Sequence, residues 1–252
     1  MAWGMTVFKD HFSSNAAKYA AHRPTYPTAL VDFLTEVAPE RNLALDCGCG
    51  TGQLSVLLAS RFKRVIATDA SPQQIANATP HQGIEYRTAP AEDSGLPDRS
   101  ADLVTAGQAA HWFDLEAFYA EVWRVVRPRA ILALIAYGVL HVEGDTDELV
   151  QRFYGEVLGP YWPPERRHVE DGYRNLPFPC EGIETPALGL EVSWALVDLI
   201  GYIGTWSGVK EYEKARGRAS VDDFYAELRE GWGDPAARRT VRWPLSLRVG
   251  RI

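Results

Sequence analysis

One glycine-rich segment limits what this chain can fold into more than any other feature. Residues 43–53 read Leu-Ala-Leu-Asp-Cys-Gly-Cys-Gly-Thr-Gly-Gln, so an apolar run stops at Asp46 and every second residue is then glycine. Residues 53–59 follow with apolar side chains at helical spacing. The order strand, glycine turn, helix opens an α/β domain. Because glycine permits φ > 0 and close backbone approach, the turn predicts a ligand cradle before a helix N-terminus.

The spacing of Gly48, Gly50 and Gly52 indicates which ligand the turn holds. A dinucleotide fingerprint requires G-x-G-x-x-G, and a phosphate loop ends in a glycine followed by lysine. Here the third glycine comes one residue early, and no lysine follows it. Asp46, placed ahead of the glycines, repels pyrophosphate and suits an ammonium group. A cofactor with an amino-acid end, a ribose and no phosphate fits this pattern.

A second acid lies one strand-helix-strand step further along the chain. Residues 64–68 are apolar and β-branched, and they end at Asp69. An acid at the end of a second strand can accept hydrogen bonds from both ribose hydroxyls. Ser71 and Pro72 then have the pattern of a helix start, with Ser as N-cap and Pro as first helical residue.

Strand and helix patterns alternate through the first half of the chain and weaken after residue 138. The sequence predicts helices over residues 28–37, 53–61, 71–78 and 115–126, and strands over residues 43–46, 64–68, 84–88, 101–107 and 131–137. Further helices are expected near residues 147–158, 193–206 and 221–230, with a last strand over residues 241–249 at a hairpin edge. The expected fold class is α/β, a doubly wound, mostly parallel seven-stranded sheet with an N-terminal lid and a helical insertion before the last strands.

This pattern predicts a single domain over residues 1–252. Within it we expect a lid over residues 1–28, a cofactor-binding core over 29–138, a substrate-side insertion with helices over 139–240, and a C-terminal strand over 241–252.

Composition and charge exclude several classes of function. The net charge of −7 argues against a nucleic-acid partner, which needs a basic face. The longest apolar stretch, residues 130–140, is shorter than the roughly 20 residues of a membrane span, and the N-terminus lacks the pattern of a secretory signal. The cysteines (Cys47, Cys49 and Cys180) are too few for a disulfide scaffold and lack a second ligand pair for metal. We therefore expect a cytoplasmic monomer or homodimer with no metal, no nucleic acid and no membrane partner.

The motifs together resemble those of class I S-adenosylmethionine-dependent methyltransferases of the type 11 kind. The matching blocks are residues 45–52, Asp69, residues 89–97, residues 100–105 and residues 123–134. The resemblance implies a Rossmann-like fold and S-adenosyl-L-methionine as the cofactor. It implies that Asp46 and the 48–52 backbone hold the methionine end and that Asp69 holds the ribose. Ala91 and Glu92 would hold the adenine, although Pro90 stands where many relatives carry Asp.

A narrower resemblance is to the trans-aconitate methyltransferase-like group. It rests on His11-Phe12, Tyr19, Arg23-Pro24, Tyr26-Pro27, residues 108–114 and residues 201–207. Characterised members of this group methylate small carboxylic acids. The resemblance therefore implies O-methylation of a small carboxylic acid by in-line displacement, in which most of the catalysis comes from positioning. A carboxylate nucleophile is already ionised at neutral pH and needs no base.

The candidate site residues lie mainly at predicted strand ends, where open α/β sheets bind ligands. The predicted cofactor-binding residues are Asp46, Gly48, Cys49, Gly50, Gly52, Asp69, Ala70, Ala91, Glu92, Gln108, Tyr19 and Arg23. His111 is the predicted catalytic residue, as a base or as a partner of a carboxylate; the alternative is plain packing beside Trp112. Arg23 can pair a carboxylate of cofactor or substrate, or simply lie on the surface. The predicted substrate-binding residues are Trp112, Tyr137, Tyr202 and Trp206, although aromatics at helical spacing are also typical of a core.

Three other functions stay open at this stage. An O- or N-methyltransferase of an aromatic or natural-product intermediate would need base assistance and a rate that rises with pH. A non-catalytic S-adenosylmethionine-binding module would need no chemistry at all, but the complete motif set argues against it. A dinucleotide oxidoreductase conflicts with the glycine spacing.

Overall fold

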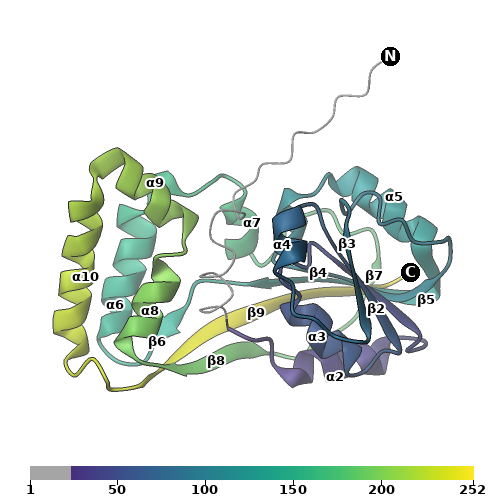
Figure 1. Cartoon of the computed structure of the whole chain (residues 1–252), viewed down its shortest axis with the longest axis horizontal. Helices are drawn as coiled ribbons and strands as arrows, with labels where there is room; N and C mark the ends of the chain where they lie inside the picture. The colour runs from purple at the N-terminus through teal and green to yellow at the C-terminus, as the bar shows by residue number, and fades with distance from the viewer. Residues whose placement is uncertain (1–23) are drawn as a thin grey trace, which may run out of the picture.

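A single sheet runs through the molecule and joins two lobes (Figure 1). The computed structural model describes residues 24–252. The elements in chain order are α2 (Thr28–Val37), β1 (Leu43–Cys47), α3 (Gln53–Ala59), β2 (Arg64–Asp69), α4 (Pro72–Ala76), β3 (Ile84–Thr88), β4 (Ala101–Gly107), the 3₁₀ helix η2 (Ala110–Trp112), α5 (Leu115–Val125), β5 (Val126–Tyr137), β6 (His141–Val142), α6 (Thr146–Arg152), the π-helical turn η3 (Phe153–Val157), the 3₁₀ turn η4 (Gly159–Tyr161), α7 (Arg166–Glu170), β7 (Glu181–Gly182), β8 (Gly189–Trp194), α8 (Leu196–Ile203), α9 (Ser207–Arg216), α10 (Arg218–Trp232) and β9 (Arg239–Arg251).

The first lobe, residues 24–137, is a doubly wound sheet. Strands β3, β2, β1, β4 and β5 lie side by side in that order and are all parallel. Along β5, Ile131 and Ile135 pack on one face of the sheet with helices α2 and α3, while Leu132 and Leu134 pack on the other face with α5. Because both faces are covered, the central strands β1 and β4 are buried almost throughout, whereas the edge strand β3 is partly exposed.

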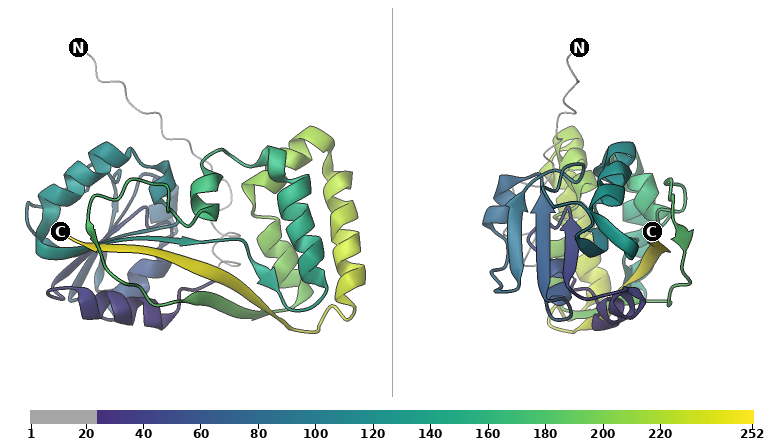
Figure 2. Two further views of the ribbon diagram at one scale, coloured as in Figure 1. Left: turned by 180° about the vertical axis from the view of Figure 1, so that it is seen from behind. Right: turned by 90° about the vertical axis from the view of Figure 1, so that its right-hand side faces the viewer.

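Strand β9 connects the two lobes. Its second half, residues 245–251, pairs antiparallel with β5, and residues 250–251 also pair with β7. Its first half, residues 239–244, pairs with β8 and β6 in the second lobe. Figure 2 shows β9 running from one lobe to the other as one extended strand.

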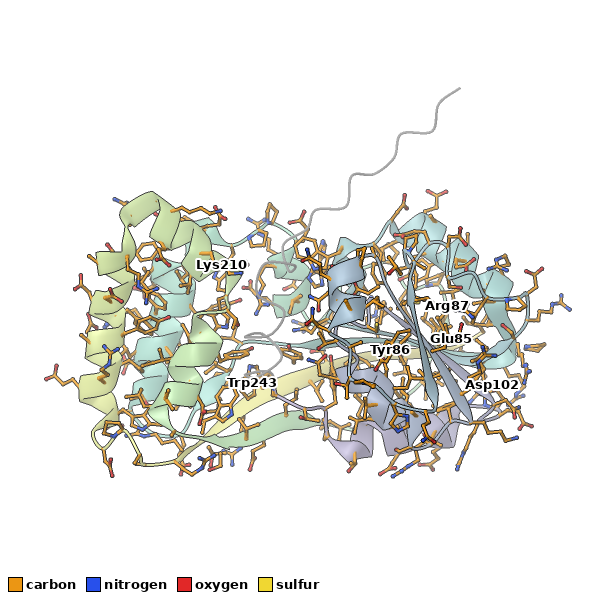
Figure 3. The ribbon with its side chains drawn as sticks, in the orientation of Figure 1. Glu85, Tyr86, Arg87, Asp102, Lys210 and Trp243 are labelled. Atoms are coloured by element: carbon orange, nitrogen blue, oxygen red, sulfur yellow. The ribbon has the colours of Figure 1, made fainter. Side chains whose placement is uncertain are left out.

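The second lobe, which we call the cap, comprises residues 138–238 apart from the segment of α7 and β7 that packs on the first lobe. Helices α6, α8, α9 and α10 gather beside β6 and the first half of β9 (Figure 1). Their interior is largely aromatic: Phe153 stacks on Phe224 with ring centroids 3.6 Å apart, and Tyr202 and Trp194 both contact Trp243. Figure 3 shows Trp243 at the side of the cap that faces the first lobe and Asp102 near the far end of the first lobe.

Helix α7 lies between the two lobes (Figure 1). It packs against η2 and β5 of the first lobe, and its residue Val169 is buried in the core on the α5 side of the sheet. The segment that carries α7 therefore belongs to the first lobe by packing, although it lies within the insertion by sequence.

The fold class expected from the sequence is confirmed, but three details were wrong. The sheet has nine strands rather than seven, because the short β6, β7 and β8 add to β9. Residues 193–194 end strand β8 instead of starting a helix, since Leu190, Val192 and Trp194 alternate toward the interior with a period of two. Strand β9 does not lie at a hairpin edge, because it is paired on both sides.

Candidate functional site

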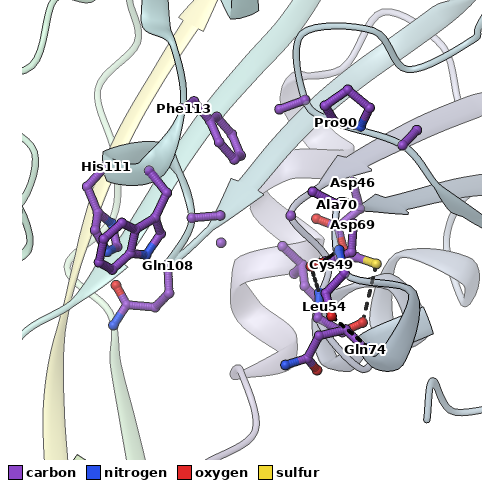
Figure 4. A pocket seen from close by; sticks show the side chains of 18 of the residues that line it. Asp46, Cys49, Leu54, Asp69, Ala70, Gln74, Pro90, Gln108, His111 and Phe113 are labelled. Atoms are coloured by element: carbon purple, nitrogen blue, oxygen red, sulfur yellow. Dashed lines mark hydrogen bonds between the residues drawn. The ribbon is translucent and has the colours of Figure 1, made fainter. Parts of the chain in front are cut away.

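A cavity of about 610 Å³ opens at the carboxyl ends of β1, β2 and β4 in the first lobe. Open α/β sheets bind ligands at this edge, and the volume is within the range of small-molecule sites. The lining residues are Tyr26, Asp46, Gly48, Cys49, Gly50, Gln53, Leu54, Asp69, Ala70, Ser71, Gln74, Ala89, Pro90, Ala91, Glu92, Gly107, Gln108, Ala109, His111, Trp112, Phe113, Asp114, Ala117 and Glu165. Figure 4 shows the glycine-loop side of this cavity facing Gln108 and His111.

The three glycines of the turn have two different roles. All have positive φ, at +66° for Gly48, +57° for Gly50 and +89° for Gly52. A Cβ on Gly48 would lie 2.5 Å from the Cβ of Ala109, and one on Gly52 would lie 2.2 Å from the hydroxyl of Tyr86. Among residues 24–252, a Cβ on Gly50 would meet only Gln74 Oε1, at 3.9 Å. Gly48 and Gly52 thus allow close packing behind the turn, whereas the bare backbone of Gly50 faces the cavity.

Asp46 ends β1 beneath the glycine turn and is 1 % exposed. Its carboxylate accepts hydrogen bonds from Ser55 Oγ at 2.6 Å and from Thr105 Oγ1 at 2.8 Å. Burial raises the pKa of Asp46 to about 6, against the lowering effect of these two hydroxyls. A cation in the cavity would offset the burial of this carboxylate, which fits the ammonium group of an amino-acid end.

Asp69 ends β2 and holds the turn as well as lining the cavity. Its Oδ2 accepts from Gly50 N at 2.9 Å, and its Oδ1 accepts from Ser71 N at 2.8 Å. A carboxylate oxygen has two lone pairs and can accept more than one hydrogen bond, so Asp69 has the chemistry to bind ribose hydroxyls. The N–H of Gly50 points at Asp69, which means that the turn offers less backbone N–H to a ligand than its sequence suggests.

The next part of the cavity lies between α4 and the loop after β3. Gln74, on α4, is 4 % exposed, and its Oε1 has no hydrogen-bond partner among residues 24–252. Glu92 Oε1 accepts from the backbone N–H of Asp114 at 2.8 Å, which fixes the loop that carries Ala91. The unused acceptor of Gln74, close to Gly50, fits a ligand that carries hydroxyl or amino donors.

The opposite side of the cavity follows β4. Gln108 has a positive φ of 54°, and its Nε2 donates to the carbonyl of Tyr137 at 3.0 Å. Its buried Oε1 has no hydrogen-bond partner in the part of the chain that the structure describes. Positive φ at a residue other than glycine costs energy and is concentrated at functional sites. This strained backbone at Gln108 holds a second buried acceptor, its side-chain Oε1, beside the cavity.

His111 stands beside Gln108 on η2. Its Nδ1 is 2.8 Å from the hydroxyl of Tyr173, a fully buried side chain whose φ is also positive, at 61°. Arg248 donates to the carbonyl of Tyr173 at 2.7 Å and holds this backbone in place. The imidazole ring is thus fixed from behind while His111 lines the cavity.

The structure brings most of the predicted cofactor residues together. Those that line the cavity are Asp46, Gly48, Cys49, Gly50, Asp69, Ala70, Ala91, Glu92 and Gln108. Gly52 packs behind the turn against Tyr86, as described above. Tyr19 and Arg23 lie outside the described residues.

The four aromatics predicted for the substrate divide into two groups. Trp112 lines the cavity beside His111, with ring centroids 4.8 Å apart. Tyr137, Tyr202 and Trp206 do not line it. Tyr137 is buried at the end of β5, while Tyr202 accepts from Trp243 Nε1 at 3.1 Å and packs against Trp206 inside the cap.

Several lining residues were missed by the sequence reasoning. Gln74 and Phe113 had a detectable signal, because both fall a few residues after a predicted strand end. Glu165 and the supporting Tyr173 had none, since they come from the insertion and reach the site only through tertiary packing.

The metal expectation can be checked against the same residues. No group of three or more His, Cys, Asp or Glu within residues 24–252 is arranged to hold a metal ion. In this range no helix is long and apolar enough to cross a membrane.

Comparison with known proteins assigns the family. The model of a methyltransferase domain matches residues 45–134. A protein of Dictyostelium discoideum, provisionally named a methyltransferase, is 37% identical over 89% of this chain and 86% of its own length. An uncharacterized methyltransferase of Mycobacterium tuberculosis is 33% identical over 75% of this chain and 74% of its own.

A solved structure supports the same assignment. A protein of Anaeromyxobacter dehalogenans, provisionally described as a type II methyltransferase, superposes with a TM-score of 0.86 at 47% identity, covering 91% of this chain and 97% of that one. The chain therefore belongs to the class I S-adenosylmethionine-dependent methyltransferases, and its cofactor is S-adenosyl-L-methionine.

The described residues fit this cofactor. A buried carboxylate with a raised pKa suits its ammonium group, a second carboxylate at the end of β2 suits its ribose, and the bare backbone of Gly50 leaves room for close approach. Among the described residues that line the cavity there are five carboxylates and neither Lys nor Arg, which suits a cofactor with two positive charges.

Proposed function

We propose that this protein methylates the carboxyl group of a small organic acid and forms its methyl ester. When bound, S-adenosyl-L-methionine would supply an electrophilic methyl group with a neutral thioether as leaving group, and the carboxylate of the acceptor would be the nucleophile. The resemblance to the trans-aconitate methyltransferase-like group supports this substrate class. No proton needs to be removed from the acceptor, because a carboxylate is ionised at neutral pH.

The observation that carries the proposal is the hydrogen bond between His111 and Tyr173. The backbone N–H groups of Ala110 and His111 lie near the Tyr173 hydroxyl and oppose the effect of burial, which raises the pKa of this tyrosine. We infer that the hydroxyl, whose oxygen faces these N–H groups, donates its own proton to His111 Nδ1, at 2.8 Å. The neutral imidazole then carries its proton on Nε2 and acts as a donor. A donor suits a carboxylate acceptor, whereas a base would need the other tautomer.

The remaining residues on this side of the cavity position the acceptor. Trp112 supplies an aromatic wall, and an aromatic face also attracts a sulfonium. Gln108, anchored to the carbonyl of Tyr137, fixes the end of β4 against which the acceptor would lie. Glu165, next to α7, also lines the cavity, so the α7 segment closes part of this side.

The test is a coupled assay for S-adenosylhomocysteine release with small carboxylic acids, phenols and amines, each measured from pH 6 to pH 9. We expect turnover on acids with no basic limb in the pH profile. Turnover on phenols or amines that rises through the pKa of a histidine would replace the proposal with a base-assisted methyltransferase. Cofactor binding without turnover on any class would favour the non-catalytic module.

Other expectations from the sequence belong to this proposal and stay predictions. They are the roles of Tyr19 and Arg23, the substrate-side role of residues 139–240, a cytoplasmic location, a monomeric or homodimeric state and the lack of a nucleic-acid partner.

A further inference from the structure

We propose that Arg166, at the start of α7, is the receptor for the anionic group of the methyl acceptor. This inference rests on the proposed function and names the residue that would select acids. It addresses a problem that the cavity itself poses: the described lining residues include five carboxylates, and His111 is the only basic side chain among them. An acid that enters this region requires a compensating positive charge.

Arg166 is held at the junction of the two lobes. Helix α7 packs directly against η2, which carries His111, and the neighbouring Glu165 lines the cavity. The guanidinium of Arg166 lies 5.6 Å from the ring centroid of Tyr154 and 5.2 Å from that of Trp162, both in the cap. Its charge also reaches Tyr173, where it opposes the rise in pKa that burial causes. Arg166 thus contacts the cap aromatics from a helix that packs against η2, the element that carries His111.

In the described part of the chain, the guanidinium of Arg166 is oriented by one hydrogen bond, and only one of its nitrogen atoms takes part in it. Its Nε donates to the hydroxyl of Tyr154 at 2.8 Å, and that hydroxyl donates to Glu170 Oε1 at 2.5 Å. Neither Nη group of Arg166 has an acceptor within residues 24–252, although the side chain is half-buried among aromatic rings. A partly buried guanidinium is stabilised by an anionic partner, and carboxylates bind it through two parallel hydrogen bonds. With Nε engaged by Tyr154, the pair left for a carboxylate is Nη1 and Nη2.

The surrounding rings explain why this site would favour organic acids over inorganic anions. Tyr154 contacts Trp162 and Trp206, with ring centroids 4.7 and 5.4 Å away. Such rings bury the carbon skeleton of a small acid while the guanidinium binds its charge. The aromatics predicted for the substrate in the cap would then act around Arg166 instead of around the cofactor.

The test measures binding of succinate, with succinamide as its neutral match, to the protein saturated with S-adenosylhomocysteine. Calorimetry gives the affinity, and tryptophan fluorescence gives a second readout because Trp162 is close to Arg166. We expect succinate and not succinamide to bind. We expect Arg166→Gln to weaken succinate binding about 10-fold to 100-fold, the loss of a charge-assisted pair of hydrogen bonds, with unchanged affinity for S-adenosylhomocysteine.

Two further variants keep the test decisive. Arg167→Gln removes the same charge from the exposed neighbouring residue and should leave succinate binding unchanged. Arg166→Lys keeps the charge but loses the planar fork, so it should retain the fold and an intermediate affinity even if Arg166→Gln unfolds. Equal succinate affinity in the wild type, Arg166→Lys and Arg166→Gln would overturn the inference. The absence of succinate binding to the wild type at millimolar concentration would overturn it as well.

The outcome is separable from that of the proposed function. If acids bind through Arg166 but no carboxyl group is methylated, the receptor stands and the proposed function fails. If carboxyl groups are methylated with an unchanged KM in the Arg166 variants, the proposed function stands and the receptor fails.

Discussion

The two lobes of this protein differ in how their candidate site residues are brought together, and therefore in how well the sequence predicts those residues. In the first lobe the ligand-facing residues come from strand ends at regular intervals along the chain, so Asp46, Asp69 and Gln108 reach one edge of the sheet together. At the junction of the lobes, by contrast, Tyr154 and Trp162 of the cap meet Arg166 of α7 only through tertiary contacts. The first lobe thus supplies the candidate cofactor residues, and under our proposal the acceptor binds on the side of the cap.

The largest expected effect is on the first lobe's hold on the cofactor. Asp69→Asn should weaken binding of S-adenosylhomocysteine more than about 100-fold, because it replaces the carboxylate that we propose accepts from ribose hydroxyls and also disturbs the bond to Gly50 N. Calorimetry measures the affinity. Glu85→Gln, on the neighbouring strand but exposed and paired with Arg64 and Arg87, is the control and should bind normally (Figure 3). Normal affinity in Asp69→Asn would remove the ribose assignment.

The glycine turn should separate packing from ligand approach. Gly52→Ala should lower the free energy of unfolding by about 2–4 kcal/mol, since φ is +89° and a Cβ would lie 2.2 Å from the Tyr86 hydroxyl. Gly50→Ala should cost only about 1 kcal/mol but should weaken cofactor binding, because its Cβ would enter the cavity. Urea unfolding measures the stability of each variant, and calorimetry measures its affinity for the cofactor. Equal stability losses would show that the turn is not divided in this way.

Asp46 should make cofactor binding depend on pH near 6. Burial raises its pKa to about 6, so below that pH the carboxylate is protonated and attracts an ammonium group less. Affinity for S-adenosylhomocysteine should therefore fall as pH drops from 7 to 5, and the fall should be absent in Asp46→Asn.

The same carboxylate should also affect stability. Its folded pKa, about 6, is above the ordinary value of 3.8, so the unfolded state ionises first. The stability contributed by Asp46 is then present below pH 4 and is lost between pH 4 and pH 6, by about 3 kcal/mol. The difference between wild type and Asp46→Asn in urea unfolding at each pH isolates this contribution; a difference independent of pH would contradict it.

The smallest expected effect concerns the support of His111. Tyr173→Phe should lower stability by about 1 kcal/mol and turnover several-fold, because Nδ1 loses the hydroxyl that sets its tautomer. Cofactor affinity should not change. A new basic limb in the pH–rate profile is the signature that distinguishes a role in orienting His111 from simple packing, and its absence would count against that role.

Much of the first lobe could be predicted from sequence because its signals are local. The helix over residues 28–37 and the strands over 84–88 and 101–107 match the structure residue for residue. The start of β5 at Val126 was missed because Pro128 and Arg129, with φ at +68°, lie in a bulge before the regular strand. Periodicity carries no information about such an irregular pairing.

The cap and the support of the site could not be predicted in the same way. Strands β6 and β7 have only two residues each, too few to show a period. Tyr173 adopts positive φ at a bulky residue, which no sequence preference favours, and it reaches His111 only through the packing of α7 on η2. Such contacts join residues that are far apart in sequence and lie outside long helices or strands, so they leave no local sequence pattern.

The most direct test of the account is to locate the transferred methyl group. The protein is incubated with S-adenosyl-L-methionine carrying a ¹³C-labelled methyl group and with an acid that releases S-adenosylhomocysteine, and the product is examined by NMR and mass spectrometry. We predict a single labelled methyl ester, which mild base converts to labelled methanol and the original acid. Label on carbon, nitrogen or an ether oxygen would contradict the claim that this methyltransferase acts on carboxyl groups.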